Sequence, residues 1–128
     1  MLHHLTLWVP DLARSEPPWR WLLGELGYTL DRTVDRVLVF RHPSGFALAL
    51  EESADMVPGM LYSRLRPGMN HVAFTLASAS LLDDIVAKAS DYGWSLFPAD
   101  RHPIAGGARV AYLEDVDGFE VELVAPNP

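Results

Sequence analysis

The chain has 128 residues, enough for one domain with a core, and its 49% hydrophobic and 21% charged residues are typical of a globular protein rather than a disordered one. Its net charge of −7 argues against nucleic acid or an anionic membrane surface as a partner, and the absence of cysteine excludes disulfides, thiolate nucleophiles and thiolate metal sites. No segment is apolar enough to span a membrane and no signal peptide is evident, so we expect a cytoplasmic protein.

The first half of the chain predicts a strand, a helix and three further strands. Residues 2–9 alternate between apolar and polar, which is typical of a strand. Ser15, followed by two prolines, is expected to begin a helix, because proline is tolerated in the first turn. Gly27 is expected to end that helix as a C-cap. The three strands that follow are predicted over residues 28–34, 36–41 and 46–52.

An irregular connector then separates the two halves. It spans residues 53–68 and contains the breakers Pro58-Gly59 and Pro67-Gly68. Its apolar residues suggest that it packs against the protein. After it the same order returns, with a strand, a helix and three strands predicted over residues 70–76, 80–92, 95–98, 109–113 and 119–124.

The same residue types at the starts of strands and the ends of helices indicate that this repetition is an internal duplication. His4 opens the first half and His71 the second, while Gly27 and Gly93 follow the two helices. We therefore predict an α+β fold of two paired βαβββ modules within a single domain, with module one at 1–52, the connector at 53–68 and module two at 69–128.

One face of the predicted strands is polar or lined by small side chains. A single helix per module can cover only one face, so the other face suits the wall of a cavity. On it Glu122 interrupts an apolar strand, which costs free energy unless the carboxylate is paired or the face is open to water. The residues predicted on this face are His4, Thr6, Trp8, Ala47, Ala49, Glu51, His71, Ala73, Thr75, Glu120 and Glu122.

Three segments carry a family resemblance: residues 4–15, Asn70 to Phe74, and Glu114 to Leu123. They resemble the vicinal oxygen chelate superfamily, which includes glyoxalase I, extradiol dioxygenases, and bleomycin- and fosfomycin-resistance proteins. The resemblance implies paired modules that form an open, barrel-like mixed sheet around a divalent metal, with the helices outside. It also implies ligands from the first, fourth, fifth and eighth strands, positions that here hold His4, Ala49, His71 and Glu122.

Ala49 departs from this pattern because its side chain cannot bind a metal. One interpretation is a site of three ligands, His4, His71 and Glu122, like the two-histidine, one-carboxylate pattern of non-haem iron oxygenases. The other adds Glu51, which would require its strand to shift register by two residues. We prefer three ligands and keep Glu51 as a base or substrate contact. The alternative for both histidines is an ordinary strand position.

His102 is a further catalytic candidate, in a loop with proline and glycine near the expected cavity mouth, although a surface histidine is the simpler interpretation. Two functions follow. The first is a metal-dependent lyase or dioxygenase in which Fe, Mn, Zn or Ni polarises a small oxygen-rich substrate. The second is a metal-free protein that sequesters a small molecule of antibiotic type. The resemblance also favours a homodimer.

Overall fold

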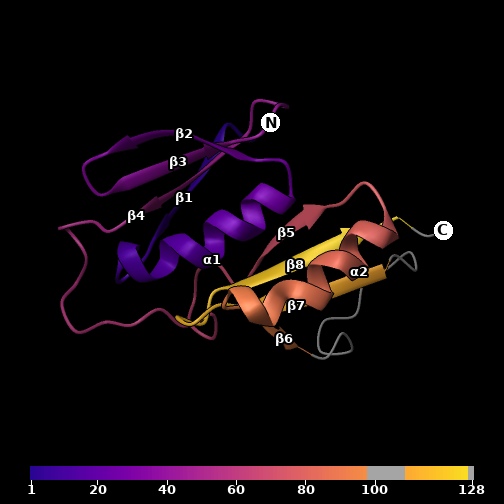
Figure 1. Cartoon of the computed structure of the whole chain (residues 1–128). Coiled ribbons are helices and arrows are strands. Elements are labelled where there is room, and N and C mark those ends of the chain that lie inside the picture. The colour runs from indigo at the N-terminus through magenta and orange to yellow at the C-terminus, as the bar shows by residue number, and fades with distance from the viewer. Residues whose placement is uncertain (98–108, 127–128) are drawn as a thin grey trace. The chain divides into compact units, whose positions relative to one another are not determined.

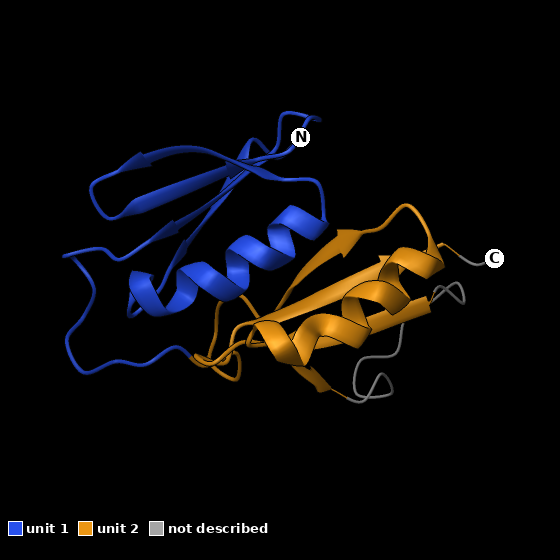
Figure 2. Ribbon diagram, viewed as in Figure 1, with its two compact units in different colours: residues 1–62 blue, residues 63–128 orange. Residues whose placement is uncertain are grey.

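The computed structural model describes residues 1–97 and 109–126, which fall into two compact units, unit 1 (residues 1–62) and unit 2 (residues 63–128) (Figure 1; Figure 2). Unit 1 contains β1 (His4–Trp8), α1 (Leu12–Glu25), β2 (Thr29–Val34), β3 (Val37–Arg41) and β4 (Ala47–Glu51). Unit 2 contains β5 (Val72–Thr75), α2 (Ala79–Lys88), the 3-10 turn η1 (Ala89–Tyr92), β6 (Ser95–Phe97), β7 (Arg109–Glu114) and β8 (Glu120–Ala125). The β-α-β-β-β order predicted for each half is confirmed.

Each unit is built on a four-stranded mixed sheet. The strand order is β1-β4-β3-β2 in unit 1 and β5-β8-β7-β6 in unit 2. In both sheets the first strand runs parallel to the fourth, and the remaining neighbours are antiparallel. The predicted α+β class is confirmed, and the described strands close no barrel. The division between the units falls inside the predicted connector, whose own bounds stay a prediction.

The first helix begins earlier than predicted. It starts at Leu12, because the side chain of Asp11 accepts a hydrogen bond from the backbone N–H of Arg14 at 3.1 Å and so caps the helix. Ser15 is therefore not the entry but a buried helical residue, and the two prolines lie inside the helix. The predicted end is confirmed, since Gly27 has a φ of 89°, and Gly93 has the same φ after η1.

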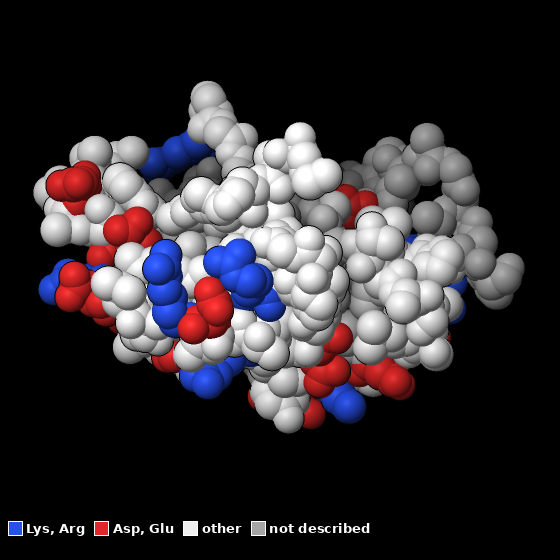
Figure 3. Space-filling model, turned by 90° about the horizontal axis from the view of Figure 1, so that it is seen from above, with Lys and Arg blue, Asp and Glu red and all other residues white. Residues whose placement is uncertain are grey.

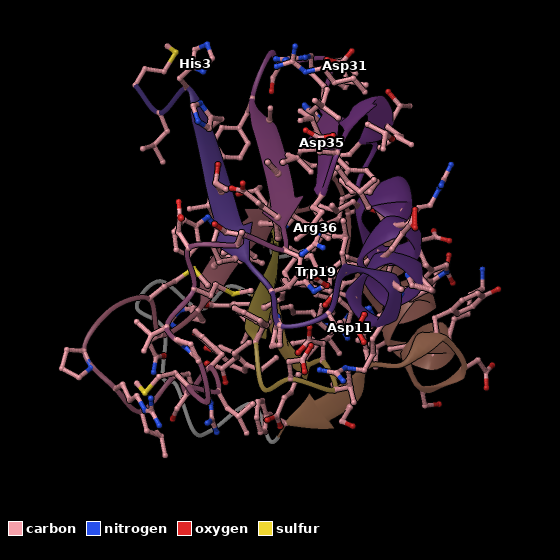
Figure 4. The ribbon with its side chains drawn as sticks, turned by 90° about the vertical axis from the view of Figure 1, so that its left-hand side faces the viewer. His3, Asp11, Trp19, Asp31, Asp35 and Arg36 are labelled. Carbon is pink, nitrogen blue, oxygen red and sulfur yellow. The ribbon has the colours of Figure 1, made fainter. Side chains whose placement is uncertain are left out.

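The helices bury the apolar faces of the two sheets. Figure 4 shows Trp19 on the side of α1 that faces the sheet, and its side chain is fully buried, as are Leu48 and Leu50 of β4. In unit 2, α2 lies over β7 and β8 (Figure 1), and Val121 and Leu123 are fully buried. The apolar side chains predicted under the helices in β4 and β8 are therefore buried, and burial of such side chains stabilises each unit by about 1.5–3 kcal/mol apiece.

The expectation that the apolar residues of the connector pack holds only in part. Val57, Met60 and Leu61 are exposed, whereas Met56 and Tyr62 are half-buried. The breakers explain this, since Gly59 and Gly68 both have positive φ and keep the chain in turns rather than in an element that could be covered. Among the helices of the described residues, none is long and apolar enough to cross a membrane.

Candidate functional site

Two buried carboxylates define the open face of the sheet in unit 2. Glu120 is 1% exposed and Glu122 is 7% exposed, although both point away from the helix-covered face of β8. Glu122 lies opposite Ala73 of β5 on one side and Tyr112 of β7 on the other. The alternative that Glu122 is a solvated strand residue is therefore excluded. A buried carboxylate requires partners that compensate its lost hydration.

His71 provides one partner for each carboxylate. Its Nε2 atom lies 3.0 Å from Oε2 of Glu122, and its Nδ1 atom lies 3.8 Å from Oε2 of Glu120. His71 immediately precedes β5, which runs parallel to β8, so the sheet itself brings the imidazole beside the two glutamates. The sequence prediction that His71 and Glu122 share one face is confirmed.

The separation of 3.0 Å between Nε2 of His71 and Oε2 of Glu122 is that of an ordinary hydrogen bond. Two ligands of an octahedral ion, at right angles and each at about 2.1 Å, would be about equally far apart, whereas two ligands of a tetrahedral zinc ion would be about 3.4 Å apart. Imidazole and carboxylate donors without thiolates suit Fe, Mn, Zn or Ni.

Tyr112 holds the other oxygen of Glu122. Its hydroxyl donates to Oε1 of Glu122 at 3.4 Å, and its ring is fully buried. Burial, followed by the negative charge of Glu122, raises the pKa of Tyr112 above its ordinary value of 10.0. The hydroxyl therefore stays protonated at neutral pH and continues to donate. The sequence suggested Tyr112 as an aromatic that lines a pocket or packs in the core, without predicting this hydrogen bond.

Arg64 is a residue of the open face that the sequence did not reveal. Its Nε atom is 3.9 Å from Oε1 of Glu120, and its guanidinium lies 4.9 Å from the ring centre of Phe97. Such a position over an aromatic face stabilises a cation. Arg64 belongs to the irregular connector, where no periodicity indicates which way a side chain points.

The open face of unit 1 carries a different set of contacts. Nε1 of Trp8 donates to Oε1 of Glu51 at 3.0 Å. The register of β1 and β4 is continuous, with Thr6 opposite Ala49 and Trp8 opposite Glu51. The shift by two residues that a fourth ligand from Glu51 would need does not occur. Glu51 lies beside Trp8, at the opposite end of β1 from His4. The residues between these two positions each advance the strand by about 3.3 Å.

The two other predicted histidines, His4 and His102, lie outside the described residues of unit 2. His4 is exposed at the start of β1, where its Nδ1 atom lies 2.8 Å from Nδ1 of His3, which Figure 4 shows at this end of the strand. His4 belongs to unit 1 and is described there by itself, so its role as a third ligand stays a prediction. His102 lies outside the described residues. Within residues 1–97 and 109–126, no group of three or more His, Cys, Asp or Glu side chains could hold a metal ion.

Comparison with known proteins gives the family. The family model described as Glyoxalase/Bleomycin resistance protein/Dioxygenase superfamily matches residues 3–112. The uncharacterized protein YqjT of Bacillus subtilis (strain 168) is 34% identical over 128 residues, which cover 98% of this chain and 99% of that protein. A crystal structure of a candidate glyoxalase from Bacillus halodurans has a TM-score of 0.86 at 35% identity, covering 98% of this chain and 96% of the other.

A more distant structure shares the fold. It is a variant of the fosfomycin resistance protein FosX from Listeria monocytogenes, in complex with Mn(II) and 1S,2S-dihydroxypropylphosphonic acid. Its TM-score is 0.70 at 21% identity, over 99% of this chain and 90% of that one. Because the family model spans most of the chain and both Bacillus relatives match nearly its whole length, the chain belongs to the glyoxalase/bleomycin resistance protein/dioxygenase superfamily.

Proposed function

We propose that the protein is a metal-dependent enzyme of the glyoxalase or dioxygenase type that acts on a small oxygen-rich substrate. His71 and Glu122 would be ligands of one divalent ion, and His4 would be the third. The observation that carries the proposal is the distance of 3.0 Å between Nε2 of His71 and a buried oxygen of Glu122. Burying a carboxylate costs hydration free energy, and a nearby positive centre compensates that cost.

The residues of unit 2 would divide the work. Glu122 and His71 would hold the ion, which when bound would polarise adjacent oxygens of the substrate. Tyr112 would keep the carboxylate of Glu122 in place, because its buried hydroxyl remains protonated and donates to Oε1. Three protein ligands would leave positions for water or substrate. The FosX structure, which contains Mn(II) and a vicinal diol, offers a precedent in the same fold.

Other parts of the proposal rest on the sequence. Glu51 is proposed as a base or substrate contact rather than a ligand, and its carboxylate is oriented by Trp8. His102 is retained as a catalytic candidate. A homodimer with a small-molecule substrate is proposed, without nucleic acid. On the face that Figure 3 shows, Lys and Arg side chains lie among Asp and Glu side chains.

Elemental analysis and metal titration test this function directly. Wild-type protein, purified without a histidine tag, should bind one divalent ion per chain, and Glu122→Ala should lose at least tenfold in affinity. The fold should persist in Glu122→Ala, because the apolar core lies on the other face of β8. Binding should weaken at acidic pH, because ligand nitrogens must be deprotonated.

Asp31→Asn is the matched control, since it neutralises an exposed carboxylate of unit 1 that pairs with Arg41 and should leave the affinity unchanged. If wild type binds no divalent ion, or Glu122→Ala binds as tightly as wild type, the metal-dependent function is wrong.

A second function then takes its place, a metal-free protein that sequesters a small molecule. The observation that favours it is Trp8, which is 47% exposed opposite Glu51 of β4. An exposed aromatic side chain suits stacking of a planar ligand. In that case a chelator would leave ligand binding unchanged.

A further inference from the structure

Asn70 lies between the connector and His71 and contacts both. Its Nδ2 atom donates to the backbone carbonyl of Arg64 at 3.1 Å. Its Oδ1 atom lies 2.8 Å from Nδ1 of His71. The first contact determines the orientation of the amide, because a carbonyl oxygen can only accept and must face the NH₂ group. The oxygen of Asn70 therefore faces the imidazole.

This orientation determines which ring nitrogen of His71 carries hydrogen. An amide oxygen has no hydrogen to donate, so a hydrogen bond at 2.8 Å requires that Nδ1 of His71 is the donor. The carboxylate oxygen of Glu120, 3.8 Å from the same nitrogen, favours hydrogen there as well. In the neutral ring, the lone pair is then on Nε2, the atom that faces Glu122.

A lone pair on Nε2 opposite a carboxylate oxygen at 3.0 Å is unfavourable by itself. Two acceptors at that distance require a positive centre, either a second proton on the ring or a cation bound by both atoms. A histidine that binds a metal through one nitrogen usually donates its other N–H to an oxygen, which sets the tautomer and the ring orientation. Asn70 supplies that oxygen here.

We propose that Asn70 is a positioning residue, which holds His71 in the Nδ1–H tautomer and so presents Nε2 to the metal ion. This inference rests on the proposed function but concerns a residue that touches neither metal nor substrate. Asn70 acts through two hydrogen bonds, one that orients its own amide on the Arg64 carbonyl and one that orients the imidazole.

The matching histidine of unit 1, His4, contacts another imidazole where His71 contacts an amide oxygen. His4 is preceded by His3, and the two Nδ1 atoms are 2.8 Å apart. Either ring can donate in that contact, so it does not select a tautomer of His4. An amide oxygen selects one tautomer, whereas a second imidazole does not, and this contrast singles out Asn70.

Two substitutions and two readouts test the inference. The variants are Asn70→Ala, which removes the acceptor, and Asn70→Asp, which keeps an acceptor oxygen but loses the Nδ2 donor. Asn70 is exposed, so neither change should unfold the protein. The readouts are the long-range ¹H–¹⁵N spectrum of the imidazole nitrogens in metal-free protein at pH 8, with His71 assigned from a His71→Gln spectrum, and the dissociation constant for zinc.

Metal-free wild type should carry hydrogen on Nδ1 of His71, either in the Nδ1–H tautomer or, because the Glu122 carboxylate faces Nε2, in the doubly protonated ring. Asn70→Ala should show a mixture of tautomers and bind zinc about 10–100-fold more weakly, as expected when an outer-shell partner of a ligand is lost. Asn70→Asp should retain the Nδ1–H tautomer and recover most of the affinity. Ser44→Ala is the control, because it removes a hydroxyl 2.8 Å from Nδ1 of His42, a histidine of unit 1, and should change neither readout.

An unchanged Nδ1–H tautomer in Asn70→Ala would overturn the inference, and so would an Nε2–H tautomer in wild type. Equal loss in Asn70→Asp and Asn70→Ala would also overturn it, because the acceptor oxygen would then not be the cause. Failure of the proposed function would look different: wild type would bind no zinc, while its His71 spectrum would still show hydrogen on Nδ1, the atom that faces Asn70.

Discussion

The two units share one scaffold and differ in what their open faces carry. Both place the first strand parallel to the fourth, and both turn out of a helix through a glycine with a φ of 89°. On the open face, however, β4 has Ala47 and Ala49 where β8 has Glu120 and Glu122. Topology and core therefore constrain the covered face, while the open face can change its chemistry without changing the fold.

The histidines at the two matching positions show a second difference. Nδ1 of His71 contacts the amide oxygen of Asn70, and its Nε2 faces the buried carboxylate of Glu122. His4 has another imidazole on Nδ1 and is exposed. The carboxylate of unit 1 on this face, Glu51, is bonded to Trp8 two positions farther along the strand than Ala49. Unit 2 thus has two buried carboxylates beside a histidine on this face, and unit 1 has a hydrogen-bonded tryptophan and glutamate.

The largest expected effect tests whether the two covered faces are equally important. Each unit buries one tryptophan completely, Trp19 from α1 and Trp94 from the turn after η1. Trp19→Ala and Trp94→Ala should each lower the free energy of unfolding by about 3–5 kcal/mol, because a large cavity replaces each ring. Urea denaturation measures both. A loss below about 1 kcal/mol for either variant would contradict the equivalence of the two cores.

A transplanted carboxylate tests whether the open faces really differ only in their side chains. Ala49 lies opposite Thr6, as Glu122 lies opposite Ala73. Ala49→Glu should cost about 1–3 kcal/mol in metal-free protein, because Ala49 is buried and the new carboxylate loses hydration.

Divalent metal should restore part of that stability and bind more tightly to Ala49→Glu than to wild type, as measured by thermal unfolding with and without zinc. Ala49→Gln has the same length without the charge and should show no such gain. Equal behaviour of Ala49→Glu and Ala49→Gln would contradict the proposal that this position belongs to a metal site.

The contribution of Tyr112 to the stability of unit 2 should depend on pH. Its pKa is raised above 10.0 by burial and by Glu122, so the folded protein holds this proton more strongly than the unfolded chain does. The resulting stability is present below pH 10 and is lost as the pH rises through the folded pKa. Tyr112→Phe should cost about 0.5–1.5 kcal/mol at neutral pH through the lost hydrogen bond to Glu122.

Above pH 10 the difference between wild type and Tyr112→Phe should shrink, as followed by urea denaturation of metal-free protein across the alkaline range. A difference that stays constant would show that Tyr112 has no raised pKa. Tyr28→Phe is the comparison from unit 1, where burial alone raises the pKa of the tyrosine.

The smallest effect belongs to the Trp8–Glu51 contact. Glu51→Gln keeps a hydrogen-bond acceptor for Nε1 of Trp8, so stability should change by less than about 1 kcal/mol. The fluorescence of Trp8 should still shift, since a neutral amide replaces the carboxylate beside its indole. If stability fell by several kcal/mol, the open face of unit 1 would be part of the structural core.

Sequence alone was sufficient for the covered faces and for the order of the elements. The sequence predicted the alternation at Val121 and Leu123 and the glycines that end the helices. It also predicted His71 on the same face as the acidic residues of the last strand. Strand periodicity and turn residues are properties of short segments, which is why the sequence shows them. The first helix was misplaced at its start, because the hydroxyl of Ser15 and the carboxylate of Asp11 are both good caps and only the backbone decides between them.

Tertiary structure decided the chemistry of the open face. The burial of Glu122, its bond to Tyr112 and the approach of Arg64 depend on side chains from β5, β7 and the connector, which no periodicity in one segment can reveal. The same holds for Asn70, whose effect on His71 depends on which way its amide is turned by a carbonyl six residues earlier. Local pattern encodes which face a residue takes, whereas its protonation and partners follow from distances across strands that only the folded chain defines.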